Sequence, residues 1–118
     1  MRILLAAAAA LLALAAPGVA QADDDEARDR ARCAGGTAEL RVRADDGRLE
    51  VELRVDASRR AGTVRVVLLH ERALVHRGTG RAGRYRLRRT VPDWPGRETL
   101  TARVSTARRG TCTLVVTV

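Results

Sequence analysis

The chain has 118 residues, 22 of them arginine and none lysine, and its formal net charge is +8. A chain of this length forms one small domain with a modest core, so we expect no second folded domain. The only serines are Ser58 and Ser105, and the nucleophile pattern G-x-S-x-G is absent. Since no catalytic, metal-binding or nucleotide-binding motif stands out, we expect neither an enzyme nor a bound cofactor.

Residues 1–22 have the pattern of a secretory signal peptide. Arg2 supplies the positive start, Ile3–Ala16 is an unbroken apolar run, and Ala20-Gln21-Ala22 is a small-x-small cleavage site. The apolar run is shorter than the ~20 residues that a membrane span requires. We therefore expect cleavage before Asp23, a mature chain without a membrane span, and a secreted, extracellular protein.

Residues 23–34 alternate acidic and basic side chains, with alanine as the main apolar residue. This composition predicts a flexible charged leader that does not pack against the domain. A short helix over 26–32 would be too short to hold in water without tertiary contacts. We expect the folded domain to occupy residues 35–118.

The strongest local pattern lies in residues 38–55. Two runs, 38–44 and 49–55, alternate apolar and charged residues on either side of Asp46-Gly47. A two-residue type I′ turn at this Asp-Gly pair predicts a β-hairpin in which apolar residues face one another. On the opposite face the same register gives three pairs of opposite charge: Arg43 with Glu50, Arg41 with Glu52 and Glu39 with Arg54.

The rest of the chain predicts five more strands, at residues 62–70, 74–77, 84–91, 100–104 and 112–118. A turn is expected at Glu71-Arg72, a flexible loop at Gly78–Gly83, and a loop at Pro92–Gly96, because prolines do not occur in central strands. Seven short strands without a helical pattern predict an all-β fold. We expect a seven-stranded antiparallel β-sandwich of the immunoglobulin or fibronectin type III kind.

Cys33 and Cys112 are the only cysteines. In an exported domain of this size such a pair is expected to form a disulfide, here joining the two ends of the mature chain. The alternative is a redox or metal-binding pair. The absence of a C-x-x-C motif and the presence of only two histidines disfavour that alternative.

Several segments follow one another in a recognisable order: a cysteine, then ELRVRADDGRLEVELRVD, TVRVVLLHE, GRYRLRRTV and LTARVSTARRGTC. This order resembles small secreted actinobacterial proteins with an immunoglobulin-like fold, and the resemblance covers most of the mature domain. It implies the fold and export. Because that family has no assigned activity, the resemblance transfers no functional residue. Members often have an Asn-Gly turn where this chain has Glu71-Arg72.

A group of arginines is the candidate site for binding an anion: Arg84, Arg86, Arg88 and Arg89. Three of them alternate along one strand and should share its outward face, and Arg77 and Arg81 come shortly before. Such a row could bind an anionic cell-envelope polymer or an acidic protein surface. The alternative is a solubilising strand face that protects a sheet edge from aggregation.

The charge of the mature chain is unevenly distributed. Residues 23–58 contain 7 arginines and 11 acidic residues, whereas residues 59–118 contain 14 arginines and 3 acidic residues. The first part of the mature chain is therefore net negative and the second part net positive. Because opposite charges on two copies could attract each other, self-association is an alternative function. Nucleic acid is not an expected partner, because Tyr85 and Trp94 are the only aromatic residues that could stack on bases.

The remaining candidates are His70, His76 and Trp94. The two histidines flank the predicted Glu71-Arg72 turn, where solvent-exposed hairpin residues are the expected interpretation. A metal site or a hydrolase built on them ranks last, since further ligands or a nucleophile would be needed. Trp94, in a proline-flanked loop, either covers the end of the core or provides a loop contact for a sugar ring.

The sequence therefore predicts a secreted, non-catalytic immunoglobulin-like module whose partner is unknown. The preferred function is recognition of an anionic surface by the arginine-bearing strand. The alternative is a structural or self-associating extracellular protein that binds no small ligand.

Overall fold

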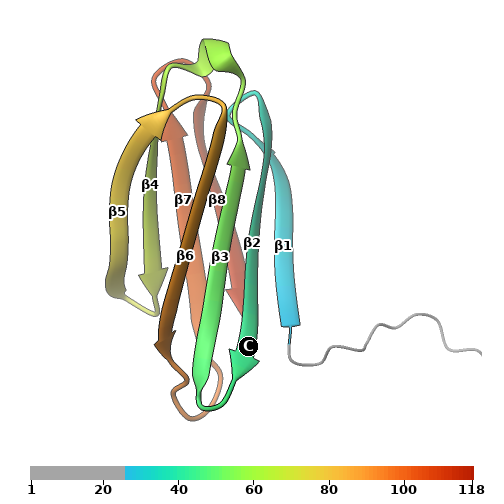
Figure 1. Ribbon diagram of the computed structural model, residues 1–118, viewed down its shortest axis with the longest axis vertical. Helices are drawn as coiled ribbons and strands as arrows, with labels where there is room; N and C mark the ends of the chain where they lie inside the picture. The colour runs from blue at the N-terminus through green and yellow to red at the C-terminus, as the bar shows by residue number, and fades with distance from the viewer. Residues whose placement is uncertain (1–25) are drawn as a thin grey trace, which may run out of the picture.

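The computed structural model describes residues 26–118 and shows a β-sandwich (Figure 1). The predicted signal peptide, its cleavage before Asp23 and the first residues of the predicted leader lie outside the described residues. The strands are β1 (Glu26–Cys33), β2 (Gly36–Asp45), β3 (Arg48–Asp56), β4 (Thr63–His70), β5 (Ala73–Arg81), β6 (Arg84–Pro92), β7 (Thr99–Thr106) and β8 (Gly110–Thr117). A short 3₁₀ helix, η2 (Arg59–Ala61), precedes β4.

Two antiparallel sheets of four strands pack face to face. The first sheet has the order β1-β2-β3-β6 and the second the order β5-β4-β7-β8 (Figure 1). Alternate residues of each strand point between the sheets, and large apolar side chains such as Leu40, Leu53, Leu68 and Leu114 are completely buried there. The predicted antiparallel sandwich is confirmed, but residues 26–118 contain eight strands rather than seven.

The predicted hairpin is the β2–β3 pair, and its register is confirmed. Leu40 lies opposite Leu53 and Arg41 opposite Glu52. Asp46 and Gly47 both have positive φ, at 55° and 78°, as a type I′ turn requires. Turn chemistry and the apolar pattern therefore favour the same register.

The flexible leader expected at residues 23–34 is wrong for the part that the structure describes. Residues 26–33 form β1, which pairs with β2 along its whole length. Ala27 and Ala31 lie on its inner side and pack against the core, where small side chains suffice because β1 is an edge strand. Ala34 and Gly35, with φ of 58° and 76°, close a tight turn into β2.

The flexible loop expected at Gly78–Gly83 is also wrong, because β5 continues to Arg81. Gly78 and Gly80 lie on the inner side of β5, against the ring of Tyr85 from β6. A Cβ on Gly80 would lie 3.0 Å from Tyr85 Cδ2, so the glycine makes room for the ring. The glycines that suggested a loop instead allow the two edge strands to approach each other.

The disulfide between Cys33 and Cys112 is confirmed, with a Cα separation of 5.8 Å. It joins β1 of the first sheet to β8 of the second. Asp29 Oδ2 also accepts a 2.9 Å hydrogen bond from the Val115 backbone N–H of β8. One side of the sandwich is thus closed by a covalent bond and a polar contact. The opposite side is formed by the edge strands β5 and β6 (Figure 1).

Within residues 26–118, no helix combines the length and the apolar character that crossing a membrane would require.

Candidate functional site

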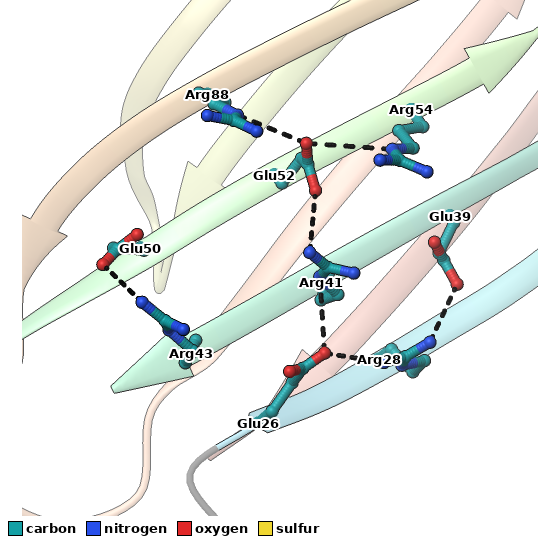
Figure 2. A network of polar contacts seen from close by, with 9 residues as sticks. All are labelled: Glu26, Arg28, Glu39, Arg41, Arg43, Glu50, Glu52, Arg54 and Arg88. Atoms are coloured by element: carbon teal, nitrogen blue, oxygen red, sulfur yellow. Dashed lines mark hydrogen bonds and ion pairs between the residues drawn. The ribbon is translucent and has the colours of Figure 1, made fainter. Parts of the chain in front are cut away.

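Alternating arginines and glutamates cover the outer face of the first sheet (Figure 2). The ion pairs across β1, β2 and β3 include Arg28–Glu26 at 2.7 Å, Arg43–Glu50 at 3.2 Å, Arg41–Glu26 at 3.3 Å and Arg41–Glu52 at 3.3 Å. A depression of about 520 Å³ lies among these side chains. Because positive and negative groups line it together, the depression does not favour one sign of charge.

Glu52 on β3 is the most enclosed carboxylate of this face, with an 11% exposed side chain. It accepts a 3.3 Å hydrogen bond from Arg88 Nε and lies within 4 Å of Arg41 and Arg54. Burial opposes its ionisation, but the hydrogen bond from Arg88 and the charges of Arg54 and Arg41 outweigh it, so the pKa of Glu52 is lowered. Glu52 therefore stays ionised and neutralises part of the arginine charge around it.

The predicted arginine row lies on β6, with its three members exposed on the outer face of the first sheet. Its neighbours come from β3, because β6 pairs antiparallel with that strand. The directly opposite residues are Asp56 for Arg84, Arg54 for Arg86 and Glu52 for Arg88. Arg88 is thus paired with a carboxylate, and Arg84 Nε lies 3.9 Å from Asp56 Oδ1. Only the middle arginine faces a residue of its own charge.

Arg54 and Arg86 form the unusual position of the row. Like charges directly opposite each other in a sheet are destabilising. The Nε–H of Arg54 is buried and has no hydrogen-bond acceptor among the described residues. Glu52 Oε2 lies 3.7 Å from Arg54 Nε, whereas Arg86 has no carboxylate within 4 Å among the described residues. The pair therefore leaves positive charge that an anion bound at Arg86 would offset.

Arg89 does not share the face of the other three arginines. Its Nη2 donates a 3.0 Å hydrogen bond to His76 Nδ1 on β5, and its Nη1 donates to the backbone carbonyl of Arg88 at 2.7 Å. His76 Nε2 in turn lies 3.5 Å from the hydroxyl of Tyr85. Arg89 is held at the side of the sandwich between β5 and β6, and His76 is partly buried rather than fully solvated.

The pKa of His76 is lowered, first by burial and then by the positive charge of Arg89. Folding therefore favours the neutral form of the His76 ring. The stability that this neutral ring contributes is fully present above about pH 6.5, the pKa in the unfolded chain, and is lost as the pH falls through the lower pKa of the folded protein. We expect NMR of the imidazole to give a midpoint below about 6.5, and Arg89→Gln to raise it partway. A wild-type midpoint at or above 6.5 would contradict this arrangement.

The second sheet carries a basic face that sequence reasoning missed. None of its four strands contains an acidic residue. Val67 on β4 lies opposite both Arg77 of β5 and Arg103 of β7, and Arg65 is two residues from Val67 on the same outward face. Arg65 and Arg103 are isolated in the sequence, and Arg77 was expected beside the arginine row of β6, so only the strand pairing brings the three together.

At the end of the sandwich that includes the β6–β7 loop, His70 is buried, with 2% exposure. Its Nε2 lies 2.5 Å from Glu98 Oε1, and its ring stacks on Trp94 with centroids 3.9 Å apart and planes 13° apart. The expectation of a solvated hairpin residue is wrong for His70. Trp94 covers one side of the His70 ring and is itself 41% exposed.

Two carboxyl groups meet beside this stack. A hydrogen bond to Glu98, together with burial and the charge of Glu98, raises the pKa of Asp93. Burial opposes ionisation of Glu98, but hydrogen bonds from Asp93, His70 and the Trp94 backbone lower its pKa. When the two carboxyl groups share a single proton, that proton therefore resides on Asp93 and the negative charge on Glu98.

Ser58, one of the two serines of the chain, has a structural role. Ser58 Oγ accepts a 3.2 Å hydrogen bond from the Arg60 backbone N–H and caps η2. In residues 26–118 no three side chains of the metal-binding types cluster as a metal site would require. Comparison of the chain with protein-family models, with curated proteins and with solved structures finds no match.

Proposed function

We propose that the protein is an exported, non-catalytic module of the immunoglobulin or fibronectin type III kind. The strand order supports this class. β2, β3 and β6 correspond to strands A, B and E, while β5, β4, β7 and β8 correspond to C′, C, F and G. β1 is then an additional strand before strand A. The disulfide between β1 and β8 supports export, because such bonds persist in oxidising compartments.

The module recognises an anionic polymer or an acidic surface through the outer face of β6. The observation that carries this proposal is the Arg54–Arg86 pair, two arginines directly opposite each other on β3 and β6. Among the described residues only Arg54 has a carboxylate, that of Glu52, within 4 Å. The free energy that the folded protein loses through this repulsion is recovered when an anion binds. The β5–β6 segment, residues 73–92, contains six arginines and no acidic residue, which extends the positive field around the pair.

The geometry of a strand favours an extended ligand. Alternate residues of a strand are about 6.8 Å apart, so a polyanion lying along β6 meets Arg84, Arg86 and Arg88 in turn. Carboxylate, sulfate and phosphate groups all offer the acceptor oxygens that guanidinium groups bind.

Self-association through complementary charge has less support. The described residues contain 21 arginines and 11 acidic residues, so two copies repel each other at long range. The carboxylates of the first sheet are moreover engaged by arginines of the same sheet. They are not available as a negative patch for a second copy.

A charge reversal at the centre of the row tests the proposal. Arg86→Glu places a carboxylate opposite Arg54, so we expect unchanged or slightly higher stability, by about 0.2–1 kcal/mol, together with weaker binding of a polyanion. Retention on a heparin column, measured as the salt concentration of elution, should fall clearly below that of the wild type. The thermal midpoint should not fall.

Two matched controls separate a local site from net charge. Arg103→Glu makes the same charge change as Arg86→Glu, but on the second sheet. A triple serine variant of β6 replaces Arg84, Arg86 and Arg88. Its control replaces three arginines of β1 with serine, Arg28, Arg30 and Arg32, so both triple variants lose the same charge. We expect both β6 variants to elute earlier than their controls. Equal elution of the β6 variants and their controls would reject a site on β6, and stronger loss in Arg103→Glu would assign binding to the second sheet.

A further inference from the structure

Trp94 lies in the loop that connects β6 to β7, between Pro92 and Pro95, and it is the only tryptophan of the chain. One face of its indole is covered by the nearly parallel ring of buried His70. The residue as a whole is 41% exposed, and no second ring of the described residues stacks on the opposite face of the indole. The loop presents a flat aromatic surface to solvent.

The position of this surface is fixed before any ligand arrives. Glu98 accepts hydrogen bonds from the ring of His70 and from the backbone N–H of Trp94, at 2.5 Å and 3.2 Å. The backbone of Glu98 is itself paired with Val118 by two hydrogen bonds of 2.9 and 3.0 Å. A ligand that stacks on the indole therefore binds without a large loss of conformational entropy in the loop.

Three carboxyl groups lie in or beside the loop, against the single arginine of the loop, Arg97, and this balance disfavours the anions that β6 attracts. Asp93 and Glu98 are next to Trp94, and the carboxylate of Glu71 accepts a 2.5 Å hydrogen bond from Thr99 N–H where β7 begins. These groups repel phosphate and sulfate, while their oxygens are good acceptors for hydroxyl groups. The net positive charge of the described residues disfavours a cationic ligand.

We propose that the outward face of Trp94 is a stacking platform for a pyranose ring of a neutral glycan. The apolar C–H face of the sugar packs on the indole, and its hydroxyl groups bond to the carboxyl group of Asp93 and to the indole N–H. This site does not depend on anion binding by β6, from which it differs in both chemistry and charge.

Two neutral probes, N-acetylated chitohexaose and cellohexaose, test the platform. Since Trp94 is the only tryptophan, its emission reports on the site alone. We expect at least one of the two probes to change the emission in a saturable way, and Arg86→Glu to leave this change intact. An oligothymidylate should have no effect, because a single aromatic ring flanked by carboxylates lacks the successive platforms and positive groove of single-strand binding proteins.

Calorimetry of Trp94→Leu distinguishes a platform from a simple cover of the core. Leucine still covers His70 but offers no flat ring, so we expect retained folding and about tenfold weaker glycan binding. Trp94→Phe keeps an aromatic face and should bind at an intermediate level. The proposal is overturned if neither glycan changes the wild-type emission, if Trp94→Leu binds the glycans as tightly as the wild type, or if only the oligothymidylate changes the emission.

Discussion

Replacing Cys33 and Cys112 with serine should lower the free energy of unfolding by about 4 kcal/mol. The bond closes a loop of 79 residues, so its removal restores considerable conformational freedom to the unfolded chain. A loss of this size is comparable with the whole stability of a small domain. Urea denaturation followed by circular dichroism measures it.

The disulfide is also the only covalent link between the sheets apart from the chain itself in the described residues. Without it, β1 is held to the second sheet mainly by the Asp29 hydrogen bond and by small apolar side chains. Reduction of the wild type should therefore reproduce the loss seen in the double serine variant. A loss below about 1 kcal/mol in both would show that packing alone holds β1 in place.

Removing the carboxylate of Glu98 should cost about 3 kcal/mol. Glu98→Ala takes the hydrogen-bond partner from buried His70 and from the Trp94 backbone N–H, and a buried polar group without a partner is costly. The double variant His70→Leu/Glu98→Leu removes both side chains of the pair, so its stability should be much closer to that of the wild type. Thermal and urea unfolding of the single and double variants give the comparison.

The same pair should make the protein sensitive to acid. Hydrogen bonds lower the pKa of Glu98 in the folded protein. The ionised carboxylate therefore stabilises the fold fully above about pH 4.3, the pKa of an unperturbed glutamate, and this stabilisation is lost as the pH falls through the lower pKa of the folded state. The wild type should therefore lose more stability between pH 7 and pH 3 than the double leucine variant does. Equal pH dependence, or a double variant as unstable as Glu98→Ala, would contradict the role given to the pair.

Local patterns were sufficient to predict the β2–β3 hairpin. Its turn residues, its alternation and its cross-strand charges all lie within 18 residues of sequence and favour one register. The disulfide was equally accessible, because the chain has only two cysteines. The hairpin depends on residues that are close in the sequence, and the disulfide on there being only one possible pair of cysteines. Neither requires knowledge of how strands distant in the sequence pair.

Features that depend on distant pairing could not be predicted. β1 resembled a solvated leader because its inner positions carry alanines and an aspartate, whose role emerges only beside β8. His70 is buried because Glu98, 28 residues away, satisfies its ring nitrogen. The outward row of arginines on β6 was predicted. That Arg86 lies opposite Arg54 could not be predicted, because it depends on β6 pairing with β3 and on the register of that pair.

The most direct test of the proposed function is NMR mapping of a heparin-derived hexasaccharide on the isotopically labelled protein. The proposed site on β6 predicts that the largest shift changes occur in β6 from Arg84 to Arg88 and at Arg54 of β3, and that they weaken with added salt. Shift changes centred on β1, on the outer face of the second sheet or on the Trp94 loop would contradict it. So would the absence of any salt-dependent change.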